Sequence, residues 1–429
     1  MEYLFIFLGL MVFLFALGVP IAVSIGLTCL AVVAIDGGLQ AIPTGLFALQ
    51  MMRGLNNFPI LAIPFFIFAA SLMNVGSVTN RIFDFANALV GFIRGGLGHV
   101  NVVASMIFAG MSATAVADVA GIGQLEIKAM RERGYPMRFA AGITGAAAII
   151  SPVIPPSIAM VVYGWLSGTS IAALFVAGLI PGVMIGISLM ITCFVVSYWI
   201  DMPRSPRPRL LELLVLFWRA LPPLLTPLII VGGIWGGIFT PTEAGAVACV
   251  YAVFLGTVVY RDVGLRDLFG VLQRTVRFSS VILFIIAIAT FYGWLLVRLR
   301  IPQELAMMLT SLDVSETTIL FAIALFFLVI GCFMSVVEAV LIFTPIFMLT
   351  IEMLGIDPIF FGVMMVLTLS VGVITPPFGN VLFVLVEIAD IPFEKVVVAV
   401  TPFLLPILAV IALLILMPEL VTYLPGIIR

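Results

Sequence analysis

The chain has 429 residues, of which 63% are hydrophobic and only 9% are charged, and its formal net charge is −2. A soluble globular chain carries about a quarter charged residues, so this composition excludes a set of soluble domains and predicts a membrane-embedded protein. One membrane span needs about 20 apolar residues, which allows roughly fourteen membrane segments. The near-neutral charge and the lack of a basic tract argue against nucleic-acid binding.

Apolar runs follow one another along the first half of the chain, at 4–35, 60–73, 100–120, 139–150, 153–166 and 171–200. The first run continues past signal-peptide length and predicts an uncleaved span. A polar segment with three prolines follows at 201–212 and predicts a linker at the membrane surface. Apolar runs then resume at 221–239, 244–260, 279–297, 318–333, 339–351, 359–374 and 396–417.

Few residues in these runs could hold a metal or a disulfide. The single histidine, His99, is expected at a helix end in a structural role. The four cysteines are scattered singly, so neither a thiolate cluster nor a disulfide framework is indicated.

Residues that fix backbone geometry recur at a spacing of 221 positions. The pairs are Pro20 and Pro241, Gly110 and Gly331, Gly134 and Gly355, Pro155 and Pro376, and Pro156 and Pro377, with the hydroxyl residues Thr114 and Ser335. Six pairs at one spacing predict an internal repeat, which is common in secondary transporters. The loop at 128–138 carries four basic residues and its counterpart at 349–359 carries none. The positive-inside rule therefore predicts that the two repeats are inverted.

Each half contains a membrane stretch that is interrupted by small and hydroxyl residues, at Gly110–Gly123 and Gly331–Glu338. These stretches are too short to span twice and predict helical hairpins that turn back inside the membrane. Asp118 follows Thr114 by four residues and Glu338 follows Ser335 by three, so hydroxyl and carboxylate share a helix face. Helix capping and cation coordination remain equally open for Glu338. Ion or substrate binding is favoured for Asp118, because carboxylates inside spans are costly.

A double proline interrupts a second long apolar run in each half, within Ser151–Ser157 and Thr375–Asn380. Proline removes a backbone donor and clashes with the preceding turn, so both segments predict discontinuous helices. Their unwound carbonyls can bind sodium, and the half-helix N-termini can face an anion. Because both breaks lie at equivalent repeat positions, the sequence predicts the binding region there.

Two other clusters have structural interpretations. Thr240-Pro241-Thr242-Glu243 predicts a helix start with a capping box and proline in the first turn. Basic residues downstream are predicted to anchor the protein at the cytoplasmic membrane surface: Arg261, Arg266, Arg274 and Arg277.

In order and spacing, four motifs resemble the large membrane subunit of TRAP transporters, the tripartite ATP-independent periplasmic uptake systems of the C4-dicarboxylate type. They are Gly237–Ala244, Gly134-Tyr135, Phe139–Ala141 and Pro155–Ile158, and the resemblance covers essentially the whole chain.

Two further segments follow the family with departures. The segment Ser112–Asp118 resembles the family's Ser-Gly-Ser-Ala-Val-Ala-Asp, with Ala113 in place of the glycine and Thr114 in place of the second serine. Thr375–Gly379 follows the family pattern, whereas Asn380 comes one residue earlier than the family's asparagine.

The resemblance implies an all-α polytopic membrane protein with an elevator-type fold. A scaffold part (1–94 and 213–300) would hold still while a transport part (95–200 and 301–429) moves, with the linker at 201–212 between the halves. The hairpins are expected at about 97–132 and 316–355, and the broken helices at about 137–170 and 358–390.

The resemblance also implies a transporter rather than an enzyme: a sodium-coupled importer of a small organic anion in the bacterial inner membrane. A periplasmic solute-binding protein would deliver the anion, and a small membrane subunit is expected as a separate polypeptide. No cofactor is expected besides Na⁺ as the coupling ion.

Two sets of residues are predicted to form the site. The cation-binding residues are Ser112, Thr114, Ser151, Pro155, Ser335, Thr375, Pro376 and Gly379. The substrate-binding residues are Ser112, Thr114, Asp118, Ser157, Ser335, Glu338 and Asn380.

Three other functions compete with this one. The first is a self-sufficient ion-coupled carrier without a binding protein, which would lack a small membrane partner. An intramembrane hydrolase has little support, because a serine nucleophile wants a base and His99 is the only histidine. A channel is disfavoured, because paired hairpins and broken helices suit an occluding site better than an open pore.

Overall fold

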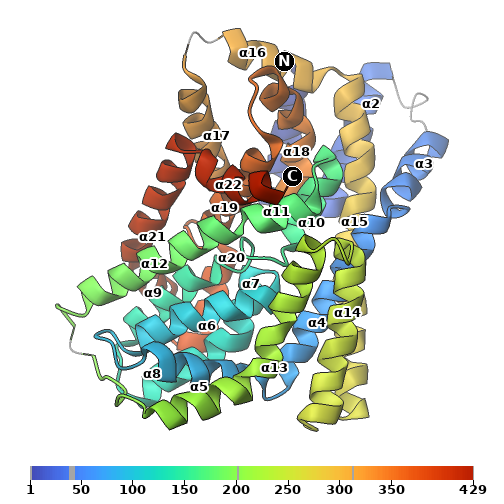
Figure 1. Ribbon diagram of the computed structural model, residues 1–429. Helices are drawn as coiled ribbons and strands as arrows, with labels where there is room; N and C mark the ends of the chain where they lie inside the picture. Colours follow the sequence, from blue (N-terminus) through green and yellow to red (C-terminus); the bar gives the residue numbers. More distant parts are fainter. Residues whose placement is uncertain (1, 38–43, 201, 312–313, 429) are drawn as a thin grey trace.

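A computed structural model describes residues 2–37, 44–200, 202–311 and 314–428, and it is built from helices (Figure 1). Within this part of the chain, seven helices are long and apolar enough to cross a membrane, by length and composition. A helix satisfies its own backbone hydrogen bonds, as the bilayer core requires. The predicted all-α, multi-pass membrane fold is confirmed.

The first helices of each half pack against one another, with α2, α3, α4, α14 and α15 on the right of Figure 1 and α5 and α13 at the bottom. Helices α2 and α3 lie along α15, α4 lies along α14, and α5 lies along α13. The elements are α1 (Glu2–Ala16), α2 (Ile21–Gly37), α3 (Thr44–Leu55), η2 (Phe58–Leu61), α4 (Ala62–Val75), α5 (Val78–Val90), α13 (Leu210–Trp235), α14 (Pro241–Phe254), η4 (Leu255–Val259) and α15 (Leu265–Arg298).

The remaining helices of the two halves also pack together. Helix α21 lies along α9 and α12, and α18 contacts α10. In the first half these elements are α6 (Leu97–Ser112), α7 (Ala115–Asp118), η3 (Val119–Gly123), α8 (Gln124–Glu132), α9 (Met137–Ala148), α10 (Ile158–Ser167), α11 (Ile171–Ala177) and α12 (Leu179–Val196). In the second half they are α16 (Ile301–Ser311), α17 (Glu316–Gly331), α18 (Val336–Met353), α19 (Pro358–Gly372), α20 (Asn380–Ala389), α21 (Phe393–Leu416) and α22 (Glu419–Ile428).

Several helix bounds recur at the spacing of the sequence repeat. Helices α9 and α19 begin at equivalent positions of the two halves, as do α3 and α15, and helices α8 and α18 end at equivalent positions. The correspondence is not complete, because the single helix α15 covers the positions that α3, η2 and α4 occupy in the first half, and α21 covers those of α11 and α12.

The expected linker at 201–212 is shorter in the structure. Asp201 lies outside the described residues, as do residues 1, 38–43, 312–313 and 429 of the expected scaffold and transport parts. No helix forms at 202–209, but α13 already begins at Leu210. The Glu212 carboxylate accepts a hydrogen bond from the Arg209 amide at 3.0 Å, and this cap starts the helix within the expected linker.

The capping box at Thr240 and the structural place of His99 at a helix end are confirmed. The Thr240 amide donates to the Glu243 carboxylate at 2.8 Å, and the Glu243 amide donates to the Thr240 hydroxyl at 3.3 Å, so α14 begins with a capping box. The His99 ring lies at the start of α6, where Nε2 is 2.8 Å from the Arg94 carbonyl oxygen.

Candidate functional site

The first hairpin turns at Ala113, between the ends of two helices. Helix α6 ends at Ser112, and Thr114 caps α7 by accepting a hydrogen bond from the Ala117 amide at 3.2 Å. Ala113 itself adopts a left-handed backbone with φ of +60°, a conformation that favours glycine. The tip therefore exposes a helix C-terminus and a helix N-terminus to the same space.

The second hairpin turns at 332–334 and is capped in a related way. Helix α17 ends at Gly331, and α18 begins after Ser335. The Glu338 carboxylate accepts a hydrogen bond from the Ser335 amide at 3.0 Å. Glu338 therefore caps α18, as one of its two interpretations predicted, and its carboxylate lies at the tip of the hairpin.

A double-proline break follows each hairpin in the chain. Between α9 and α10, residues 149–157 are not helical, and Ser157 caps α10 by accepting from the Met160 amide at 3.2 Å. Between α19 and α20, residues 373–379 are not helical, and the Gly379 amide donates to the Cys332 carbonyl at 3.0 Å. The second break is therefore bonded directly to the second hairpin tip.

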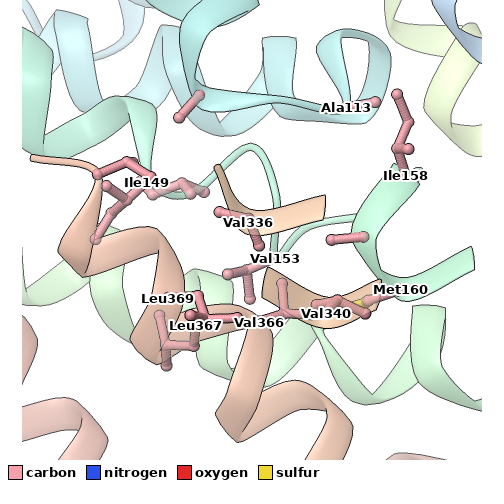
Figure 2. Close-up of a cluster of buried hydrophobic side chains, with 14 of the residues drawn as sticks. Ala113, Ile149, Val153, Ile158, Met160, Val336, Val340, Val366, Leu367 and Leu369 are labelled. Atoms are coloured by element: carbon pink, nitrogen blue, oxygen red, sulfur yellow. The ribbon is translucent and has the colours of Figure 1, made fainter. Parts of the chain in front are cut away.

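An apolar cluster packs behind the two tips and holds them against the breaks. Figure 2 shows side chains of both hairpin tips beside side chains of the first break and of α10 and α19. The labelled members are Ala113, Ile149, Val153, Ile158, Met160, Val336, Val340, Val366, Leu367 and Leu369. Interiors are close-packed, so this cluster fixes where the polar tip residues point.

Two adjoining cavities lie at the tips. The first, of about 240 Å³, is lined by four of the predicted site residues, Thr114, Ser335, Glu338 and Asn380, together with side chains of α15. The second, of about 460 Å³, is lined by Ser112 and Thr114 and by side chains of α4 and α15. Thr114 thus faces both cavities.

Other predicted site residues lie behind these cavities. Ser157 is fully buried as the cap of α10, and Asp118 is buried within the first hairpin, where the Ser105 hydroxyl donates to it at 3.0 Å. Neither lines either cavity. Ser151 is fully buried in the first break, and its hydroxyl has no hydrogen-bond partner within the described residues. Pro155, Thr375, Pro376 and Gly379 belong to the two breaks.

A second buried carboxyl was missed by the sequence reasoning. Glu126 is fully buried, and its Oε2 accepts a hydrogen bond from Asn101 Nδ2 at 2.7 Å. The same Nδ2 donates to Thr144 Oγ1 at 2.7 Å. In a regular helix, side chains eight positions apart point about 80° apart around the helix axis. The π-helical turn of η3 takes in an extra residue, and this brings Glu126 towards the helix face that carries Asp118. No local sequence signal marks this change of phase.

Two arginines contribute to a cavity that the sequence did not indicate. Arg274 and Arg277 were predicted to anchor the protein at the membrane surface, yet both line the 460 Å³ cavity beside Ser112 and Thr114. They lie three residues apart on α15 and therefore share a helix face, and both side chains are exposed while lining this cavity.

A multi-pass helical bundle with two hairpin tips and two broken helices around adjoining cavities has the architecture of a secondary transporter. The chain belongs to the tripartite ATP-independent periplasmic transporter family, DctM component, whose family model matches residues 8–420. The predicted family is confirmed. The chain is accordingly a transporter permease of the inner membrane and not an enzyme.

Several characterised proteins are similar over most of their length. The sialic acid TRAP transporter large permease protein SiaM of Vibrio cholerae is 41% identical over 413 residues, which cover 95% of each chain. The 2,3-diketo-L-gulonate TRAP transporter large permease protein YiaN of Escherichia coli is 39% identical over 97% of each chain. The crystal structure of the Alcanivorax borkumensis YdaH transporter has the same fold, with a TM-score of 0.62 and 14% identity over 92% of this chain and 96% of that one.

Proposed function

We propose that this chain is the large membrane subunit of a sodium-coupled importer of a small organic anion. The observation that carries the proposal is the meeting of polar residues from both hairpins at one cavity, Thr114 from the first and Ser335 with Glu338 from the second. The names of the relatives support the class of substrate, because sialic acid, 2,3-diketo-L-gulonate and C4-dicarboxylates are all organic acids.

Two sodium sites would lie where each hairpin tip meets its break. Ser112 and Thr114 with Ser151 and Pro155 would form the first site, and Ser335 with Thr375, Pro376 and Gly379 the second. The donor set fits, because hydroxyl and backbone carbonyl oxygens are what discontinuous helices offer to Na⁺. The buried Ser151 hydroxyl in the first break supports the first site, and the hydrogen bond from Gly379 to Cys332 supports the second by joining break to tip.

Substrate would lie between the tips. Thr114 and Asn380 offer hydrogen-bond donors there, and α7, α18 and α20 begin beside the cavity. Asp118 and Ser157, predicted as substrate ligands, would act from behind the cavity by holding the first hairpin and α10 in place. Binding of the anion would be strengthened by sodium, because two cations at the tips favour an anion between them.

The movement proposed for the cycle is that of an elevator. Helices α6–α12 and α16–α22 would form the moving part, and α1–α5 with α13–α15 the fixed scaffold. An inverted arrangement of the two halves would let one rigid part expose the same site to either side of the membrane. The recurrence of helix bounds at equivalent positions of the two halves supports this proposal.

A periplasmic binding protein and a separate small membrane subunit are the proposed partners. TRAP large permeases work with both kinds of protein. The Haemophilus influenzae permease SiaT is longer, and this chain covers 61% of it.

Reconstitution tests the proposal. The chain would be placed in proteoliposomes with and without its small subunit and binding protein, and uptake of sialic acid, succinate and isethionate would be measured with and without a sodium gradient. Uptake that needs the small subunit, the binding protein and the sodium gradient supports the proposal. Uptake that needs neither sodium nor the binding protein contradicts it and indicates a self-sufficient carrier.

A further inference from the structure

The 460 Å³ cavity brings the fixed and moving parts of the protein together. Its moving side is the first hairpin tip, with Ser112 and Thr114, and its fixed side includes Arg274 and Arg277 of α15. The next lining residues on α15 are Phe278 and Val281. These four positions follow the spacing of one helix face, so α15 presents a continuous stripe to the cavity with two cationic groups at one end.

The cavity is continuous with the one between the tips. Thr114, Val116, Phe278 and Val281 line both cavities. An anion leaving the space between the two tips therefore meets the arginine end of the same stripe without crossing another helix.

Within the described residues, neither guanidinium group forms an ion pair with an acidic side chain. In the described residues the one ion pair joins Lys128 to Glu132, on α8. No acidic side chain lines the 460 Å³ cavity. Glu338, which lines the neighbouring cavity, has one carboxylate oxygen engaged by the Ser335 amide. A guanidinium pair facing a cavity without a counter-charge is suited to a carboxylate, which arginine binds with two parallel hydrogen bonds.

The arginines lie towards the side of the protein where the basic loops gather. The turn between α4 and α5 is held to the turn before α15 by the hydrogen bond from the Ser77 amide to Asp262 at 2.6 Å. Arg81 stacks over the ring of Tyr260 in the same region. Arg274 comes ten residues after the cap of α15, about 15 Å along the helix. By the positive-inside rule this is the cytoplasmic side.

We propose that Arg274 and Arg277 form an anion-binding site on the fixed scaffold, which receives the carboxylate of the transported acid as it leaves the hairpin tips for the cytoplasm. This inference rests on the proposed function. The same charges would repel Na⁺ along this route. The site therefore favours release of the anion over its return to the tips together with Na⁺.

The test uses the complete transporter in proteoliposomes of phosphatidylcholine alone. Arg274→Gln, Arg277→Gln and the double variant are compared with Arg266→Gln, an exposed arginine of the same helix that does not line the cavity. Internal sialic acid, succinate or isethionate, whichever the wild type imports, is titrated as an inhibitor of uptake. Each cavity variant is expected to weaken internal inhibition by about tenfold, with the external sodium dependence and the Arg266→Gln control unchanged. Arg274→Lys should keep part of the effect.

Three outcomes would overturn the site. The first is unchanged inhibition by internal acid in the double variant, and the second is an equal loss of this inhibition in Arg266→Gln. The third is a loss of inhibition that appears only when anionic lipid is added, because it would assign the arginines to lipid phosphate. Thermal shift of the purified proteins with the same three acids gives a second measure of binding. If wild-type uptake proves independent of sodium, the proposed coupling fails, while loss of the acid-induced thermal shift in the double variant still supports the anion site.

Discussion

The backbones of Gly331 and Gly372 touch where the second hairpin meets its broken helix. A Cβ atom on Gly372 would lie 2.4 Å from the Cα atom of Gly331, far inside van der Waals contact. We predict that Gly372→Ala separates α17 from α19 and costs about 1–3 kcal/mol, with loss of uptake. Thermal unfolding in detergent and uptake in proteoliposomes measure the two effects.

The matched control for this substitution is Gly232→Ala. Gly232 lies in α13, and a Cβ there would meet nothing within 4 Å. Alanine is the better helix former, so this variant should retain uptake and unfold at the same or a higher temperature. Wild-type behaviour of Gly372→Ala would contradict the tight contact.

The left-handed backbone of Ala113 predicts a stabilising substitution. A non-glycine residue there costs roughly 1–2 kcal/mol, and glycine relieves this cost while losing about 0.5–1 kcal/mol of chain entropy. Ala113→Gly should therefore raise the free energy of unfolding by up to about 1 kcal/mol. Ala115→Gly, within α7, should lower it, and a lower unfolding temperature for both variants would refute the prediction.

The Asn101 amide donates to one oxygen of the Glu126 carboxyl, Oε2, and within the described residues the other oxygen has no hydrogen-bond partner. Asn101→Ala removes the hydrogen bonds to Glu126 and Thr144 and leaves a buried carboxyl unpartnered, at a cost of about 2–3 kcal/mol. Asn56→Ala, at an exposed position, is the control and should change stability little. The additional exchange Glu126→Gln in the Asn101→Ala background should recover part of the loss, because a neutral amide is less costly to bury. Equal melting temperatures for Asn101→Ala and the wild type would argue against the buried network.

Tyr135 joins the start of the first hairpin to the linker. Its hydroxyl accepts from the Leu97 amide at 3.0 Å and donates to the Pro203 carbonyl. Tyr135→Phe leaves the Leu97 amide without this acceptor and should cost about 1–2 kcal/mol. Tyr423→Phe, at an exposed site, should be neutral.

The Tyr135 hydroxyl also predicts a dependence on pH. Burial raises the pKa of this hydroxyl above its ordinary value, which is about 10. A folded-state pKa above the unfolded one means that the contribution is fully present below about pH 10 and is lost as the pH rises through the folded value. The difference in stability between wild type and Tyr135→Phe should therefore stay constant from about pH 6 to 9, and a steady decline across that range would contradict this assignment.

Local sequence chemistry was enough to place the helix breaks and turns. Pro155-Pro156 and Pro376-Pro377 interrupt their helices, although Pro222-Pro223 lies within the continuous helix α13, and Thr240 with Glu243 caps a helix by contacts three residues apart. The environment of Glu126 was not predictable, because its partner Asn101 lies 25 residues away and the intervening π turn shifts the helix phase. The contact of Arg274 and Arg277 with the cavity was not predictable for a related reason: the sequence does not say which face of α15 meets the hairpin.

The unbroken course of α15 has a mechanical consequence. Where the first half bends at residues 56–61 between α3 and α4, the second half has a continuous helix of 34 residues, about 51 Å long. A continuous ladder of backbone hydrogen bonds resists bending along α15, whereas the joint at 56–61 is held from outside by a hydrogen bond from the Thr242 hydroxyl to the Phe58 carbonyl at 3.1 Å. The second half therefore has one stiff rod where the first half has two shorter helices, and the angle between those two helices depends on the contact of Phe58 with α14.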